Sequence, residues 1–583
     1  MKIIRHSSMP ILSVTICASD SILKGNTMKD IEFNLIDEPW LKVIREDLTV
    51  ETLSLKNLLL HAQDYKDLAG ETPAQNFAVL RMLLALLYTI FERVDVDGTP
   101  DALIEIDDID AAYDAVFNRW QTLWELKHFP EKPILDYFNQ HHDAFWLFHP
   151  ARPFYQVPEA TLGSPYNAPK LIGDLSESGN KKRLFSSRSG IGKEQIPFAE
   201  AARWLLYINA FDDTSAKPKK KGLPSPGAGW VGKLGMVENV GNNLFETLLL
   251  NLTFLKDGTE LWSAPPLPAW EHPPKPDERT EISIPDEPAA LLSLQSRRIL
   301  LKRKDDAVVG YTLLGGDFFS NDDAFNEQMT SWRKINKTKK QFVWHPKRMD
   351  PNRQMWRDFG QYFLVHSRSS AESNHLPGII QWLYALKKEN IITPHKKIQL
   401  RGIALQYGDK DFFINDFSSD TLTYFTDLLN TESDGLRNQI ETEIQKCDDT
   451  ANAIHLLCRN IAIASGSDSE NEKNQQKGRR LFYQTIDQPM RAWLLQFNHE
   501  VSPENNQALF DQWENESRRI AAAIAEQLEA NAGPAAFRGH TIHDQKTEKD
   551  YHYTVSKADL QFRKSLNKIY PRKDVNHEQT TTS

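Results

Sequence analysis

The segment Glu71–Val94, ETPAQNFAVLRMLLALLYTIFERV, contains the longest apolar run of the chain. Thr72 is placed to cap a helix and Pro73 to occupy its first position, where the missing N–H of proline costs nothing. Apolar side chains fill nearly every side of this helix, so we predict that it is buried. The run itself, MLLALLYTIF, is too short to cross a bilayer, and we predict no membrane segment.

Helices and strands follow one another around this segment without a regular β-α-β rhythm. The residues from Phe33 to Ala62 predict a short hairpin that runs into a helix, and the stretches LLSLQSRRILLKRK and DAVVGYTLLGG predict strands. Further helices are expected at IPFAEAARWLLYINAF, NLFETLLLNLTFL and LPGIIQWLYALKKEN. This mixture predicts an α+β fold and not a doubly wound sheet.

After about Asp420 the pattern changes to long amphipathic helices alone. In residues 502–533 Ser502 is placed to cap, Pro503 to start, and apolar side chains recur mostly four residues apart. The segments 421–445, 451–464 and 479–497 carry the same stripe. A large mixed N-terminal domain followed by a C-terminal four-helix bundle is therefore the predicted architecture.

Composition narrows the class of protein. A chain of 583 residues is expected to form more than one domain. The formal net charge of −10 argues against a protein that coats nucleic acid over its whole surface. The three cysteines form no C-x-x-C pair, which supports neither a disulfide framework nor a zinc ribbon, and a cytoplasmic protein without a metal or cofactor is expected.

The stretch GAGWVGKL, Gly227–Leu234, is one residue away from the phosphate-binding pattern G-x-x-x-x-G-K-[ST]. Leu234 stands where the pattern needs a hydroxyl to hold Mg²⁺, and the preceding residues read as a basic, proline-rich loop instead of a strand. We therefore expect no ATP binding here.

Clusters of basic residues lie between Lys181 and Arg353, in a chain that is acidic as a whole. One charge run is usually a solvated face, but several in one region predict a basic surface whose nucleic-acid binding weakens steeply with salt. The clusters are Lys181–Arg183, Lys217–Lys221, Arg297 and Arg298 with Lys302–Lys304, WRKINKTKK and HPKRMDPNR.

One pattern points to catalysis. His142 and Asp143, in HHDAFWLFHPARPFY, form a His-Asp doublet of the kind found in metal-dependent phosphohydrolases. Further ligands cannot be assigned from the sequence, and an aromatic cluster follows at once, so a structural turn packed on aromatic rings is the favoured interpretation. A metal-dependent nuclease or phosphohydrolase built on His142 and Asp143 stays as the alternative.

The order of several segments resembles the CasA family, the large subunits of the type I-E CRISPR surveillance complex Cascade. The resemblance extends from about Met28 to about Pro571, and it rests on segments that follow one another in the family's order: FNLIDEPWLKVI, HPARPFYQ, GWVGKLG, GNNLFETLLLNL, LQSRRILL, MTSWR and the C-terminal helices. It implies a subunit without catalytic activity that acts in antiviral defence. Such subunits recognise the protospacer-adjacent motif on double-stranded DNA, help to open the duplex for the guide RNA, and receive a nuclease-helicase, beside the other Cascade subunits.

The sequence is expected to divide into four parts. Residues 1–27 are expected to be a disordered extension, because Met28 opens a segment that looks like the start of a domain. Residues 28–415 then form the mixed DNA-recognition domain, 416–575 the helical bundle and 576–583 a disordered tail.

Two loops of the family correspond to segments in the middle of this chain. The first starts at Phe185, with Ser186, Ser187 and Arg188 behind it, and an aromatic side chain there would stack or wedge at a base step. The second resembles Gly227–Gly229, whose missing side chains let backbone approach base edges in the minor groove. No single glycine of this loop is preferred.

A third loop, which supplies the family's duplex-splitting wedge, resembles Gln406–Asp411, QYGDKD. The match begins at Tyr407 and Gly408, is followed by Asp409, and places Lys410 and Asp411 where members usually carry amides. A lysine reads sequence less sharply than an amide, so the motif preference of this chain is expected to differ. Either Lys410 or Gln406 could act as the wedge, and a scaffold that docks a nuclease without touching DNA is a further alternative.

Overall fold

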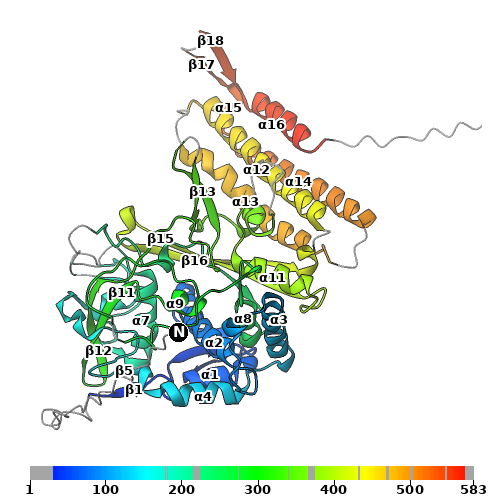
Figure 1. Ribbon diagram of the computed structural model, residues 1–583. Helices are drawn as coiled ribbons and strands as arrows, with labels where there is room; N and C mark the ends of the chain where they lie inside the picture. Colours follow the sequence, from blue (N-terminus) through cyan, green and yellow to red (C-terminus); the bar gives the residue numbers. More distant parts are fainter. Residues whose placement is uncertain are drawn as a thin grey trace, which may run out of the picture.

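The computed structural model shows a mixed body with a layer of long helices on one side (Figure 1). It describes residues 30–177, 179, 182–213, 223–273, 275–338, 341–364, 374–430, 433–467, 472–498, 503–544 and 548–571. The predicted extension 1–27 and tail 576–583 lie outside these residues. The α+β class with C-terminal helices is confirmed.

The strands form small antiparallel sheets, and none of the described strands belongs to a parallel β-α-β unit. The sheets of the body, with their strands in spatial order, are β1 (Glu32–Asn34) with β5 (Trp146–Phe148); β3 (Val50–Leu53), β2 (Leu41–Ile44) and β4 (Asp67–Leu68); β10 (Glu260–Leu261) with β9 (Leu255–Lys256); β13 (Trp332–Asn336) with β14 (Phe342–Pro346); β11 (Arg297–Lys304), β12 (Ala307–Gly315) and β6 (Ser164–Asn167), with β7 (Ile196–Pro197) also on β12; and β16 (Ile414–Phe425), β15 (Lys397–Tyr407) and β8 (Val237–Val240).

The body also contains helices, of which α2 and α3 are the longest. They are α1 (Leu55–Leu60), α2 (Pro73–Arg93), α3 (Ile109–Leu126), α4 (Glu131–His141), α5 (Ala168–Leu171), α6 (Ile191–Glu194), α7 (Phe198–Phe211), α8 (Leu244–Leu250), α9 (Pro288–Leu292), α10 (Phe359–Phe363) and α11 (Gly378–Lys388).

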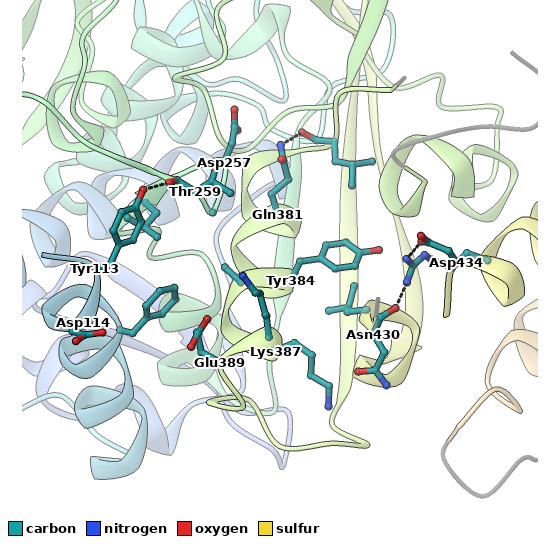
Figure 2. A pocket seen from close by; sticks show the side chains of 18 residues that line it. Tyr113, Asp114, Asp257, Thr259, Gln381, Tyr384, Lys387, Glu389, Asn430 and Asp434 are labelled. Carbon is teal, nitrogen blue, oxygen red and sulfur yellow. Dashed lines mark hydrogen bonds and ion pairs between the residues drawn. The ribbon is translucent and has the colours of Figure 1, made fainter. Parts of the chain in front are cut away.

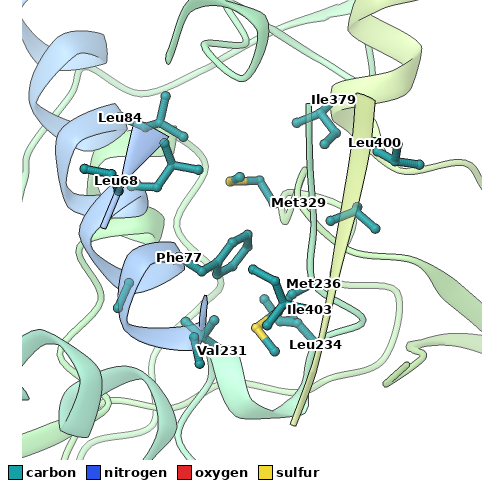
Figure 3. Close-up of a cluster of buried hydrophobic side chains, with 14 of the residues drawn as sticks. Leu68, Phe77, Leu84, Val231, Leu234, Met236, Met329, Ile379, Leu400 and Ile403 are labelled. Carbon is teal, nitrogen blue, oxygen red and sulfur yellow. The ribbon is translucent and has the colours of Figure 1, made fainter. Parts of the chain in front are cut away.

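Helix α2 is the centre of the body, as its sequence predicts. The Thr72 hydroxyl accepts a hydrogen bond from the Gln75 N–H at 3.1 Å, and Pro73 is the first helical residue. Among the described helices, α2 is the one long and apolar enough to cross a membrane by length and composition, but its side chains are packed inside the protein. Phe77 from α2 meets Leu234 and Ile403 in a buried cluster (Figure 3).

The bundle contains four long helices, but not the four that the sequence predicts. It consists of α12 (Asp434–Ala464), α13 (Glu472–Leu494), α14 (Pro503–Ala530) and α16 (Val555–Ile569). Residues 421–425 belong to strand β16, and the predicted helices 421–445 and 451–464 are replaced by the single helix α12. The fourth helix is α16, which packs along α12.

Both differences have a local physical cause. In Thr421–Phe425 Leu422 and Tyr424 are buried while their neighbours are half-buried, which is the two-residue period of a strand. In α16 the Thr554 hydroxyl accepts a hydrogen bond from the Lys557 N–H, and the buried residues Ala558, Phe562 and Leu566 recur every four residues.

Two strands also interrupt the C-terminal region, where helices alone are expected. β17 (His540–Asp544) and β18 (Lys549–Tyr553) form a hairpin between the short helix α15 (Pro534–Arg538) and α16. The hairpin projects at the end of the bundle that lies away from the body (Figure 1).

Polar contacts join the bundle to the body at β16. Both carboxylate oxygens of Asp420 accept hydrogen bonds from Arg491 Nη2, at 2.9 and 3.0 Å. The Trp356 indole donates to Asp487 at 2.8 Å, and the guanidinium of Arg357 lies 3.6 Å above the ring of Tyr483. A division at residue 416 would cut β16, so the helical part begins at α12.

Candidate nucleic-acid interface

The hairpin β15–β16 carries the predicted wedge loop at its tip. Pairing of the two strands ends at Tyr407 and Ile414, with a bulge between Gln406 and Tyr407. The Gly408 N–H donates to the Phe413 carbonyl at 2.7 Å and closes the loop. Lys410 is exposed and, like Asp411, has a left-handed backbone, with φ of 55° and 57°. Such backbone is unfavourable outside glycine, so the surrounding contacts must hold it.

Arg348 supplies those contacts. Its guanidinium donates to both carboxylate oxygens of Asp411, at 2.7 and 3.1 Å, and its Nε donates to the Gly232 carbonyl at 2.7 Å. The same group lies 4.7 Å above the ring of Tyr407. Arg348 therefore joins the hairpin tip to Gly232. Asp411, one of the predicted DNA-binding residues, is engaged in a bidentate ion pair.

Tyr407, at the start of the hairpin tip, also contacts Gly232 and the end of α7. Its hydroxyl donates to the carbonyl of Phe211, the last residue of α7, at 2.7 Å. A Cβ atom on Gly232 would lie 2.1 Å from the Tyr407 hydroxyl oxygen. Gly232 is thus a glycine because the tyrosine occupies the space of a side chain.

The glycines of the second predicted loop differ in role. Gly227 has φ of +63° and open space where a Cβ would stand, and its carbonyl accepts a hydrogen bond from Arg297 at 2.7 Å. Gly229 is buried, and a Cβ there would meet the Ala210 carbonyl oxygen at 2.3 Å. Gly227 is available for close approach of a ligand, whereas Gly229 is needed for packing against α7.

The first predicted loop presents the side chain of Phe185, which is 92% exposed. Behind it the Ser186 hydroxyl donates to the Arg188 carbonyl at 2.7 Å, and Arg188 forms an ion pair with Glu200 at 2.7 Å. Arg183 donates to the carbonyl of Ile414, the first residue of β16, at 3.2 Å. Arg183 and Gly232, which flank the first and second predicted loops, are therefore linked to the β15–β16 hairpin.

Lys233, which follows Gly232, has several positively charged neighbours. Burial, together with the positive charges of Arg297, Arg279 and Arg348, lowers the pKa of Lys233 to about 8. Asp411 is a nearby opposing charge, but Lys233 forms no ion pair within the described part of the chain. Arg297 and Arg348 are themselves paired with carboxylates, Asp212 and Asp411, so the extra positive charge beside Gly232 is that of Lys233.

The predicted basic surface is only partly correct. Arg297 and Arg298 are buried, and they form ion pairs with Asp212 and Asp317. Burial of a cation is costly without a partner, so these two arginines stabilise the body and do not face solvent. Lys181 and Lys217–Lys221 lie outside the described residues.

The His-Asp doublet holds a turn. His142 Nε2 pairs with Asp37 Oδ2 at 2.9 Å, while the exposed Asp143 lies 3.8 Å from His142 Nδ1. The backbone carbonyl of His142 accepts a hydrogen bond from the Asn34 amide at 3.1 Å. A group of three or more His, Cys, Asp or Glu side chains that could hold a metal ion does not occur in the described ranges. This arrangement supports the structural interpretation of the doublet.

A cavity of about 940 Å³ lies elsewhere, between α3, α11 and the start of α12. Its polar groups contact one another: Tyr113 donates to the Thr259 carbonyl and Gln381 to the Leu376 carbonyl, while Arg437 pairs with Asp434 (Figure 2). Neither histidine nor cysteine is among the described lining residues. The cavity therefore lacks an evident nucleophile–base pair and does not include the three loops.

The sequence predicts no site role for three residues at or beside the contacts of the hairpin tip: Arg348, Gly232 and Lys233. Arg348 is 63 residues from Asp411 and 116 residues from Gly232 along the chain, so local patterns could not join these segments. The signals that existed were the basic run HPKRMDPNR and the residues GK of the nucleotide-loop mimic.

Comparison with known proteins identifies the family of the chain. The family described as CRISPR-associated protein Cse1 matches residues 34–524. A curated relative, CRISPR-associated protein CasA/Cse1 of Thermus thermophilus, is 32% identical over 238 residues; the match covers 40% of this chain and 43% of the relative.

Solved structures match over nearly the whole length. The crystal structure of Thermobifida fusca Cse1 is 29% identical, with a TM-score of 0.78 over 93% of this chain and 98% of that chain. Cse1 from Acidimicrobium ferrooxidans has the same fold, with 24% identity and a TM-score of 0.71 over 92% and 98% of the two chains. A chain of a CRISPR RNA-guided surveillance complex also shares the fold, with 17% identity and a TM-score of 0.63 over 92% and 99%.

These matches place the chain among the CRISPR-associated proteins. Within that class it belongs to the Cse1 family, for which the curated relative also carries the name CasA.

Proposed function

We propose that this chain is the large, non-catalytic subunit of a type I-E CRISPR surveillance complex (Cascade) in the cytoplasm. In this role it recognises a short motif beside the target on double-stranded DNA, helps to open the duplex so that the guide RNA can pair, and receives a separate nuclease-helicase. Its partners are the other Cascade subunits, the guide RNA and the target duplex.

The observation that carries the proposal is the junction of three loops around the hairpin tip. Arg348 links the tip to Gly232, Arg183 links the first loop to Ile414, and Tyr407 links the tip to α7. Exposed Lys410, exposed Phe185 and the open backbone at Gly227 each lie within a few residues of these links. A duplex needs cations for its phosphates and close backbone approach for its minor groove, and the junction supplies both.

The test compares the assembled complex with and without this chain. Binding would be measured, as a function of salt, to duplexes that differ only in the few base pairs beside the target. We expect affinity to depend on those base pairs and to collapse when the chain is omitted. Unchanged affinity without the chain would leave it a scaffold at most.

Two single substitutions test whether DNA binds at the predicted loops. Lys410→Ala and Phe185→Ala should weaken binding of target duplex while the complex still assembles, as checked by size-exclusion chromatography. Normal affinity in both variants would contradict the placement of DNA at these loops.

A further inference from the structure

Two buried cations line the cavity between α3, α11 and the start of α12, and they differ in their contacts (Figure 2). Arg437 of α12 donates hydrogen bonds to the carbonyls of Leu428 and Asn430 and pairs with Asp434. Lys387 of α11 is only 9% exposed, and its ammonium group forms no hydrogen bond or ion pair with the residues that the structure describes. Three N–H donors of Lys387 are therefore left for a ligand.

A buried ammonium group without a counter-charge is unfavourable, because burial removes water that would solvate it. The nearby carboxylates that lie deepest in contacts are engaged elsewhere. Asp257 pairs with His375 at 3.5 Å, and Asp434 is the partner of Arg437. Lys387 is thus placed to bind an anionic group that enters the cavity from outside the chain.

The exposed carboxylates of the cavity limit which anion can enter. Asp114 and Glu389 line it, are exposed, and form no hydrogen bond or ion pair through their side chains within the described part of the chain. A nucleic acid would bring a row of phosphates close to these two negative charges, which is repulsive. A protein segment can place one carboxylate on Lys387 and a basic side chain beside Asp114 or Glu389. Charges of both signs therefore favour a protein segment.

The size and the walls of the cavity fit such a segment. Its volume of about 940 Å³ is large for one side chain and leaves room for several. The hydroxyl groups of Tyr113 and Tyr384 are engaged with the carbonyls of Thr259 and Phe363, so these residues line the cavity with their rings, together with Phe117. Apolar side chains of a bound segment would pack on these rings.

We propose that this cavity receives a segment of a neighbouring protein subunit of the complex, which places one carboxylate on Nζ of Lys387. The carboxylate belongs to an aspartate, a glutamate or a chain end, and a basic residue of the segment lies beside Asp114 or Glu389. The inference rests on the proposed function, because that function gives the chain permanent protein partners. A permanent subunit suits the site, since the buried cation then keeps its counter-charge for the lifetime of the complex.

The experiment treats the complete complex, with guide RNA, with a water-soluble carbodiimide. This reagent joins a lysine to a carboxylate in contact with it: the carbodiimide takes up the elements of water and leaves as a urea, and an amide forms between Nζ and the carboxyl carbon. We expect mass spectrometry to find Lys387 joined to a carboxylate of another subunit. Cross-links of Lys387 that stay within this chain, or that form only after the nuclease-helicase is added, would overturn the inference.

Lys387→Met gives two readouts that should move in opposite directions. The isolated chain should be at least as stable to urea, because an unpaired buried cation is removed. Binding of this chain to the remaining subunits should weaken about 30-fold, because the carboxylate of the partner is then buried without a counter-charge. Lower stability with unchanged affinity would show that Lys387 acts only within the fold, and would contradict the proposal.

Lys388→Met is the matched control. Lys388 is the next residue of the same helix and also lines the cavity, but it is exposed. An exposed lysine is solvated by water, so this substitution should change neither stability nor affinity by more than about twofold. An equal loss of affinity in both variants would mean that general positive charge matters and not the buried ammonium group, which overturns the inference.

Failure of the inference and failure of the proposed function give different results. If the unaltered chain does not assemble with the other subunits, the proposed function is wrong. If it assembles, Lys387 forms no cross-link to another subunit and Lys387→Met binds normally, the proposed function stands and this inference is overturned.

Discussion

Single residues at the junction lower the stability of the folded chain. Lys233 is the clearest case, because it is a half-buried cation near Arg279, Arg297 and Arg348, with Asp411 as the opposing charge. An ordinary lysine has a pKa near 10.5, and here the value falls to about 8. The folded state therefore carries an unfavourable charge at neutral pH, and a bound phosphate would relieve it.

Lys233→Met should raise the stability of the isolated chain and change its pH dependence. Below pH 8 the lysine is charged in both states, so the unaltered protein bears the whole penalty, about 3 kcal/mol for a pKa lowered from 10.5 to about 8. Between pH 8 and 10.5 the unfolded chain binds more protons, so the free energy of unfolding rises with pH until the penalty is gone. Urea unfolding at pH 7 and pH 9.5 should show a gain from the substitution that is larger at pH 7. An equal gain at both values would contradict the assignment.

The two glycines of the second loop should separate stability from binding. Gly229→Ala places a Cβ against the Ala210 carbonyl, so a loss of several degrees in melting temperature is expected. Gly227→Ala meets no neighbour and costs only about 1 kcal/mol for its left-handed backbone, yet its methyl group stands where DNA would approach. Melting curves and duplex affinity measured together should show opposite rankings for the two variants.

At the scale of elements, the β15–β16 hairpin gains its rigidity at the tip from one arginine. The strands are fixed by their own pairing and by β8, and Arg348 joins the loop from Gly408 to Phe413 to the rest of the body through Asp411. A bidentate guanidinium holds such a loop better than an ammonium group does.

Arg348→Lys should therefore loosen the tip without unfolding the sheet. Amide hydrogens of Gly408 and Phe412, which are bonded within the loop, should exchange about 10-fold faster, while those of β15 stay protected. Arg333→Lys is the control, since Arg333 is an exposed arginine of β13. Equal exchange at the tip in both variants would show that Arg348 does not hold it.

The elements that the sequence predicts best are those with strong local signals. Helix α2 has its cap, its proline and its apolar run in one continuous stretch, and each is found as predicted. In Thr421–Phe425 buried and half-buried residues alternate over a stretch too short to outweigh the long amphipathic stretch that follows, so the sequence predicts a helix where the structure has a strand. At the site, Phe185 and Gly227 could be found by resemblance, but the role of Arg348 depends on contacts between distant segments and needs the structure.

At the scale of the whole molecule, the body and the bundle meet through charged groups and not through a continuous apolar face alone. Arg491 of α13 reaches both Asp420 in β16 and Asp487 in its own helix. The strand that carries Asp420 begins at Ile414, beside the candidate DNA site, and the hairpin lies between the two parts of the protein (Figure 1).

The pair Asp420 and Arg491 should contribute to the coupling of the two parts. In a double-mutant cycle with Asp420→Asn and Arg491→Gln, the single substitutions should not add, and a coupling energy of about 1 kcal/mol is expected for a half-buried bidentate pair. Urea unfolding of the four proteins measures it. Strictly additive effects would mean that the pair contributes nothing to stability.

The order of helices in the bundle has a consequence for synthesis. The apolar stripe of α12 is covered partly by α16, through Ala558, Phe562 and Leu566, and the Tyr570 hydroxyl bonds to Ser517 at 2.7 Å. Chains leave the ribosome from the N-terminus, and domains fold as they emerge. The body can fold while translation continues, but α12 stays partly uncovered until residue 570 has left the ribosome. A stop codon before α16 would thus release a chain with a folded body, including the three candidate loops, and an open, aggregation-prone bundle.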